Sequence, residues 1–248
     1  MKLETKRLIL RDWNKKDIND IIEGLNNYNI SKWLELVPYP YTKKDAEEWI
    51  SYCKQNAKGK NRSYYFAIEL KSEKKVIGGI GIDKLNMFHE IGSDGFWINA
   101  KYHGQGYGTE ALSETIEFAF NKLKLRRLES GVFKGNMPSL KLQKKFGYKI
   151  EGLRKKGFRC KADGKLKDEY ITALLKEDWN KKYATNRFFY PVSSHTLNLG
   201  EQRIFTSRAL TLLSMQEERF ELSYPLKETG PEPVAFDQAL PPLRIIIF

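Results

Sequence analysis

The fold of this chain is decided by the stretch Tyr102-His103-Gly104-Gln105-Gly106-Tyr107-Gly108-Thr109. Its three glycines occupy every second position, and the stretch lies between an apolar, strand-like run and a helical pattern. Glycine allows positive φ and a close approach of backbone to ligand, and free N–H groups at a helix N-terminus attract anions. The stretch therefore predicts a site for a diphosphate, although a tight strand-to-helix turn alone would also use glycine.

Two other phosphate-binding motifs do not match this stretch. A nucleoside-triphosphate loop would end in Gly-Lys followed by Ser or Thr, and that ending is missing here. A dinucleotide-binding fold places an acidic residue at the end of the next strand, and Glu129, the nearest candidate, does not have that spacing. ATP and NAD are therefore disfavoured as ligands.

Strand and helix patterns alternate around the glycines. Asp17 and Thr42 predict helix starts, the second strengthened by Asp45 three residues later. Asn136 and Gly147 predict the start and the stop of another helix. The pattern predicts a mixed α/β fold. The expected strands are at 8–10, 64–70, 75–82, 95–98 and 127–133. The expected helices are at 18–25, 109–123 and 137–146, with one more that begins at residue 43.

Four segments, one of which contains the glycine stretch, give it a context. They are Leu3–Arg11, Pro38–Ala46, Trp97–Ala111, and Asn136–Ser139 together with Phe146–Gly152. In this order they resemble the GNAT acetyltransferase superfamily and, within it, the RimJ/RimL-type ribosomal-protein N-acetyltransferases, over residues 2–180. The resemblance implies a fold of the α/β (α+β) class, with a mixed central sheet splayed around acetyl-CoA and flanking helices.

The resemblance also implies which residues hold acetyl-CoA. The pantetheine arm would pair with backbone near Phe96, Trp97 and Ile98, and Asn136 would bind the same arm. N–H groups from the glycine loop would hold the diphosphate, with His103 beside them in a place where glutamine or arginine is usual. The expected loop contacts are Gln105, Gly106, Tyr107, Gly108 and Thr109.

Acyl transfer to an amine needs a neutral nucleophile, a donor for the developing oxyanion and a proton for the departing thiolate. By resemblance, Ser139 is the proton donor; its alternative role is in a helix cap. Gln143 stands where many relatives outside this branch have a tyrosine. Glu90 is the first choice of base and Asp94 the second, although either could be a solvated loop carboxylate. Ser93-Asp94-Gly95 looks like an insertion relative to the branch pattern. Such an insertion shifts which carboxylate faces the thioester.

The acceptor is less defined by the sequence than the acyl donor. Trp33 and Tyr41 are aromatic residues that could hold the amine end of a substrate, or could belong to the core. The expected reaction is acetylation of a primary amine by acetyl-CoA, foremost a protein or peptide N-terminal α-amine. The alternatives are a small-molecule amine, such as an antibiotic or polyamine, and a non-catalytic module that binds CoA, the ribosome or RNA.

Composition limits the partners and the compartment. The 248 residues carry a formal charge of +12 with scattered lysines, which fits a phosphate-rich partner or a solvated surface. No stretch reaches the roughly 18 apolar residues of a membrane helix, so a cytoplasmic protein, monomer or homodimer, is expected. Cys53 and Cys160 are far apart, so neither a disulfide nor a metal site is predicted.

The chain changes in composition near residue 183. Before it the basic residues are mostly lysine, whereas afterwards Lys227 is the single lysine, and five of the nine prolines lie in the last 24 residues. We therefore expect an acetyltransferase domain at 1–183 and a C-terminal extension at 184–248, with one helix at 206–222 and a proline-rich end.

Overall fold

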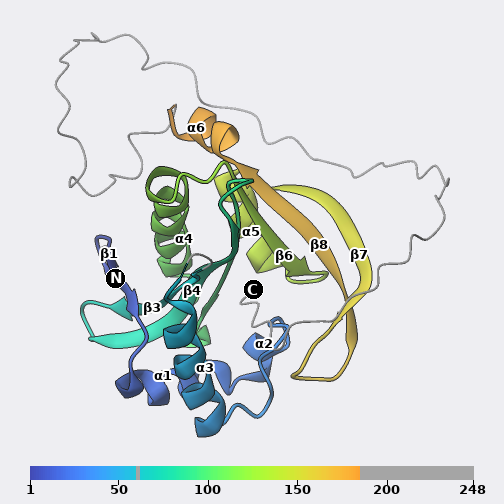
Figure 1. Cartoon of the computed structure of the whole chain (residues 1–248). Coiled ribbons are helices and arrows are strands. Elements are labelled where there is room, and N and C mark those ends of the chain that lie inside the picture. The colour runs from blue at the N-terminus through green and yellow to red at the C-terminus, as the bar shows by residue number, and fades with distance from the viewer. Residues whose placement is uncertain (60–61, 185–248) are drawn as a thin grey trace. The chain divides into compact units, whose positions relative to one another are not determined.

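The computed structural model describes residues 1–59 and 62–184 (Figure 1). The predicted helix at 206–222 and the proline-rich end lie outside these residues. Helix α6 (Lys176–Ala184) runs across the boundary predicted at residue 183. Within the described ranges, no helix has the length and apolar character needed to cross a membrane.

One sheet of eight strands forms the centre of the fold, in the order β1-β2-β3-β4-β5-β6-β8-β7. Every neighbouring pair is antiparallel except β5 and β6, which run parallel. The strands are β1 (Lys2–Glu4), β2 (Leu8–Asp12), β3 (Tyr64–Leu70), β4 (Lys75–Asn86), β5 (Ile91–Ile98), β6 (Arg127–Phe133), β7 (Lys149–Arg159) and β8 (Leu166–Leu175). The predicted mixed, splayed sheet is confirmed.

The splay lies between the two parallel strands. β5 and β6 pair only from Ile91↔Arg127 to Ser93↔Glu129, after which their registered pairing ends. The Ser130 hydroxyl donates to the Asp94 carbonyl at 3.1 Å, at the start of this fork. Beyond the fork, the backbone of β5 from residue 96 onward is available to a ligand because β6 no longer covers it.

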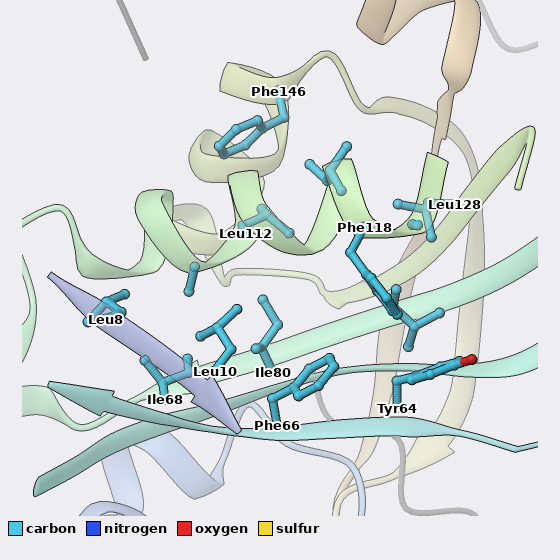
Figure 2. Packing of buried hydrophobic residues seen from close by; sticks show 14 of the residues in the cluster. Leu8, Leu10, Tyr64, Phe66, Ile68, Ile80, Leu112, Phe118, Leu128 and Phe146 are labelled. Atoms are coloured by element: carbon cyan, nitrogen blue, oxygen red, sulfur yellow. The ribbon is translucent and has the colours of Figure 1, made fainter. Parts of the chain in front are cut away.

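Helices cover both faces of the sheet. α4 (Tyr107–Glu117), α5 (Met137–Phe146) and α6 contribute to one apolar cluster, in which Leu112, Phe118 and Phe146 pack above the strands (Figure 2). A second cluster on the other face includes side chains of α1 (Ile18–Leu25), α2 (Tyr28–Ser31) and α3 (Lys43–Asn56). Single-turn elements complete the fold: η1 (Lys15–Asp17), η2 (Ala100–Tyr102) and the π-helical η3 (Phe118–Lys122).

The predicted caps differ in their outcome. Thr42 and Asp45 form a reciprocal capping box at the start of α3, and Gly147 ends α5 with φ 100°. Asp17 precedes α1 but makes no side-chain cap there. Its carboxylate instead accepts two hydrogen bonds from the Arg11 guanidinium, at 2.8 and 2.9 Å. The same carboxylate accepts from the Asn14 amide at 2.8 Å, so Asp17 caps the preceding turn η1 and not α1.

Candidate active site

The glycine loop connects β5 to α4 and has the backbone that its sequence predicts. Gly104 and Gly106 have φ of 74° and 81°, and Gly106 is the N-cap of α4. This left-handed conformation disfavours residues with a β-carbon. The first N–H groups of α4 have no acceptor within the helix. The loop therefore offers an anion both unpaired donors and the positive end of the helix dipole.

Arg7 fixes this loop from the distant N-terminal segment. Its Nη1 donates to the Gln105 carbonyl at 2.9 Å, and its Nε donates to Glu110 on α4 at 2.7 Å. The guanidinium also lies over the Tyr107 ring, 4.3 Å from its centroid. The Thr5 hydroxyl and the Arg7 amide donate to the second Glu110 oxygen. The sequence assigned no role to Arg7, because its partners lie about a hundred positions away.

A cavity of about 570 Å³ opens along the loop and the splayed end of β5. The structure gathers most of the predicted site residues around it. Its lining includes Trp33, Phe96, Trp97, Ile98, His103, Gly106, Tyr107, Gly108, Thr109, Asn136 and Ser139. A cofactor with a diphosphate and an extended arm fits a site that has an anion cradle at one end and an open strand edge along its wall.

The first turn of α5 forms another part of the wall. Asn136 caps this helix by accepting from the Ser139 amide at 3.4 Å. The Ser139 hydroxyl is half-buried and makes no hydrogen bond to the residues that the structure describes. Gln143 is buried behind it, where its Oε1 accepts from the Thr172 hydroxyl at 2.9 Å. Ser139 is thus the one residue of α5 that carries a hydroxyl, and it lines the cavity.

Glu90 is not brought to the cavity. It is exposed, and its carbonyl accepts from the Arg126 amide at 2.9 Å in the turn before β5. Six residues of extended strand, roughly 20 Å, separate Glu90 from Phe96. The register explains this position, because Ser93, Asp94 and Gly95 continue β5 without a bulge and the irregularity falls between Asp83 and Asn86. The apparent insertion therefore displaces Glu90 away from the site.

Two other predicted residues do not line the cavity. Tyr41 is only 5% exposed and belongs to the apolar cluster beneath α1 and α3. Its predicted contact with the acceptor amine is therefore corrected to a role in the core. The Gln105 side chain turns back to donate to the Lys101 carbonyl at 3.2 Å, so the contribution of Gln105 to the loop is through its backbone.

Asp94 is the carboxylate closest to the cavity along β5. It precedes Phe96 by two residues, so both side chains lie on the same face of the strand. Its Oδ1 accepts from the Tyr148 hydroxyl at 2.9 Å, and its Oδ2 is buried without a hydrogen-bond partner in the described part of the chain. Burial raises the pKa of Asp94 to about 7, against the opposing effect of the Tyr148 bond. Such a group can exchange a proton near neutral pH.

Trp33 is a further residue of the cavity wall. It is half-buried, and a β-carbon on Gly135 would approach its ring to 3.3 Å. The ammonium groups of Lys32 and Lys167 lie 5.3 and 5.8 Å from the centre of the Trp33 ring. At the loop end, His103 contacts the Ile98 carbonyl through Nε2 at 2.8 Å. Among the described residues, no group of three or more potential ligands could hold a metal ion.

Comparison with known proteins shows the family of the chain. Residues 7–149 match the acetyltransferase (GNAT) domain family. The uncharacterized N-acetyltransferase YnaD of Bacillus subtilis is 32% identical over 184 residues, which cover 73% of this chain and 100% of that protein.

Two solved structures show the range of acceptors among proteins of this shape. A putative ribosomal-protein-serine acetyltransferase from Vibrio cholerae superposes with a TM-score of 0.59 at 25% identity, covering 71% of this chain and 97% of that one. Spermidine N-acetyltransferase from Vibrio cholerae, solved with CoA and spermine, gives 0.60 at 21% identity, covering 71% and 99%. The chain belongs to the GNAT acetyltransferase family and is an acetyl-CoA-dependent N-acetyltransferase.

Proposed function

We propose that this chain acetylates the α-amine of a protein or peptide N-terminus. The observation that carries the proposal is the composition of the cavity wall, which includes no Asp or Glu among the described residues. A polyamine or aminoglycoside carries several positive charges, and a site for it needs carboxylates to replace their hydration. An α-amine has a pKa of about 8, so it is neutral, and therefore nucleophilic, much closer to pH 7 than a lysine side chain.

Acetyl-CoA supplies the acetyl group as a thioester, and the residues around the cavity would bind it and manage the protons. The loop amides from Gln105 to Thr109 would hold the diphosphate, with His103 beside it. Phe96, Trp97 and Ile98 would present backbone to the pantetheine arm. Asn136 would hold the same arm.

The transfer itself exchanges one bond for another. The C–N bond to the amine forms, the C–S bond breaks, and the amine loses one proton while the thiolate gains one. Asp94 would accept the amine proton through an intervening water, since it does not itself line the cavity. The Ser139 hydroxyl would donate to the sulfur. Asp94 takes the place of Glu90 in this scheme because Glu90 lies at the other end of β5.

We expect Asp94→Asn to remove the acidic limb of the kcat profile. With Asp94, activity rises as the carboxyl ionises through a pKa of about 7, and general-base catalysis is worth about 100-fold or more. The substitution should also change stability in a defined direction. Because the folded pKa is raised, the native state binds more protons than the unfolded state, and stability falls as pH rises from about 4 to about 7.

The free energy of unfolding of Asp94→Asn should therefore increase relative to that of the parent as pH rises through that window. Urea unfolding at several pH values between 4 and 8 measures the difference. Tyr148→Phe is the matched variant, because it keeps the carboxyl but removes its hydrogen bond. A kcat profile that keeps its acidic limb in Asp94→Asn would exclude Asp94 as the base.

We expect Arg7→Lys to weaken acetyl-CoA binding without slowing the chemical step. Lysine keeps the charge but lacks the planar guanidinium, whose Nε and Nη1 reach Glu110 and the Gln105 carbonyl separately. The KM for acetyl-CoA should rise about tenfold, equivalent to about 1.4 kcal/mol, while kcat stays near its original value. Arg11→Lys is the control, since Arg11 joins Asp17 and Glu69 away from the loop. It should lower the melting temperature and leave KM unchanged.

The test of the proposed function is an acceptor screen with the full chain. Acetyl-CoA is offered with peptides, free lysine, spermidine and an aminoglycoside, thiol release is measured, and mass spectrometry locates the acetyl group. Acetylation of peptide α-amines above all other acceptors is the expected result. A higher kcat/KM for spermidine or the aminoglycoside would overturn the proposal in favour of a small-molecule acceptor.

A further inference from the structure

We infer that the acceptor is an acidic peptide, whose negative side chains are bound by a cationic rim beside the cavity. This inference rests on the proposed function and specifies its substrate. The cationic rim consists of the basic side chain that follows α2 as its C-cap and of basic side chains on the β7–β8 hairpin. Its members are Lys32, Lys155, Lys156, Arg159, Lys161 and Lys165.

The cationic rim lies next to the part of the cavity that Trp33 lines, because the hairpin packs against the α2 segment (Figure 1). The Lys161 amide donates to the Glu35 carbonyl at 2.9 Å, and the Tyr28 hydroxyl donates to Asp163 at 3.3 Å. Lys167 reaches from β8 to within 5.8 Å of the Trp33 ring centre. Asn29, Ile30 and Trp33 of the same segment line the cavity. The tip of the hairpin thus contacts the segment that forms this part of the cavity wall.

The charges of the cationic rim are not neutralised by the other residues that the structure describes. None of its six side chains forms an ion pair with a carboxylate in the described ranges. The nearby acids are already engaged: Asp163 pairs with Lys167, and Glu169 pairs with Arg154. Lys155, Arg159, Lys161 and Lys165 are exposed. A surface with this excess of positive charge attracts anionic molecules and repels polycations.

The same charges favour the reactive form of the acceptor. A nearby positive charge disfavours the protonated form of an amine and so lowers its pKa. An α-amine that enters past Trp33 passes the ammonium group of Lys32, which lies 5.3 Å from the centre of that ring. It would therefore reach the thioester in its neutral form, while carboxylates farther along the peptide remain outside, on the cationic rim.

A peptide explains these features better than a nucleic acid does. The reaction needs an aliphatic primary amine, which nucleobases and phosphates do not carry. The hairpin also offers peptide-binding groups, since β7 is the last strand of the sheet and has one edge without a neighbouring strand among the described residues. Residues 155–157 bulge out of the β7–β8 register there and present two of the six cations. An extended chain can pair with such an edge through its backbone.

The test compares peptides that differ only in charge. Acetyl-CoA is offered with peptides that share one N-terminal residue and have Asp and Glu, Ser and Gly, or Lys and Arg at the next four positions. We expect kcat/KM for the acidic peptide to exceed that of the basic peptide by about tenfold or more at low salt, and the preference to shrink at 0.5 M salt. Aminoacylated and bare RNA are included as further acceptors and competitors.

Charge reversal assigns the preference to the cationic rim. Lys155→Glu with Lys165→Glu should remove the preference for the acidic peptide and leave kcat for the neutral peptide unchanged. Lys122→Glu with Lys124→Glu is the matched control, because it changes the net charge equally. Both lysines precede β6, whose first residue, Arg127, pairs with Leu175 at the end of β8 farthest from the hairpin turn. That control should keep the preference of the parent protein.

The outcomes separate the two proposals. If no peptide is acetylated although acetyl-CoA is consumed with another amine, the proposed function fails. If peptides are acetylated with equal efficiency regardless of charge, the proposed function stands and the acidic acceptor is excluded. If both charge-reversed proteins lose the preference equally, net charge and not the cationic rim is responsible. Preferred acetylation of an aminoacylated RNA would replace the peptide by a nucleic acid.

Discussion

Replacing Gly106 by valine is expected to lower kcat/KM for acetyl-CoA by about 100-fold, because it moves the loop amides out of position for the diphosphate. Gly106 has φ 81°, and a β-carbon there would lie 3.4 Å from Arg7 Nη2. A β-branched residue in this conformation is strained by about 1–3 kcal/mol. The loop can relieve that strain only by rotating the backbone that would face the phosphates.

A second glycine separates strain from ligand binding. Gly59 also has positive φ, 90°, and a β-carbon added there would meet no atom of the described residues within 4 Å. Gly59→Val should therefore lower the free energy of unfolding without raising the KM for acetyl-CoA. Steady-state kinetics and thermal melts of both variants provide the comparison. Equal KM values for Gly106→Val and the parent protein would mean that the loop does not hold the diphosphate.

Replacing Ser139 by alanine is expected to lower kcat by about 100-fold, the lower range for loss of a general acid. The backbone amide that donates to Asn136 remains, so the helix cap is kept. The KM for acetyl-CoA should change little. Because a thiol has a pKa of about 8.5, the thiolate leaves without protonation at higher pH.

The kcat deficit of Ser139→Ala should therefore shrink as pH rises above about 8.5. A purely structural defect would not follow the ionisation of the leaving group. Ser139→Thr keeps the hydroxyl and should recover most of kcat. A pH-independent deficit in Ser139→Ala, without recovery in Ser139→Thr, would show that the hydroxyl packs the wall and does not protonate the sulfur.

The parts of the fold that could be predicted from sequence depend on local signals. Thr42 with Asp45 determines the start of α3 over four residues, and Gly147 ends α5 through its own φ. The glycine loop is equally local. The strand patterns at 64–70 and 127–133 are confirmed because their residues are largely buried, and burial selects the apolar side chains from which a strand is recognised.

Other parts depend on contacts between distant residues. The sequence does not predict β7, because most of its residues are exposed and few are apolar. The position of Glu90 follows from the register of β4 against β5, which the sequence of the turn does not determine. Arg7 contacts the Gln105 carbonyl across 98 positions of the sequence, so the sequence around Arg7 does not predict this contact. The cationic rim likewise requires the hairpin to pack against α2, a contact between segments more than 120 residues apart.

Calorimetric titration of the full chain with acetyl-CoA tests the role of the glycine loop most directly. We predict one binding site per chain with a Kd within the range of about 1 µM to 1 mM that is typical of enzyme substrates, and at least tenfold weaker binding to Gly106→Val. Absence of binding by the folded parent protein at about 1 mM acetyl-CoA, the upper end of that range, would contradict the assignment of the loop as the cofactor cradle.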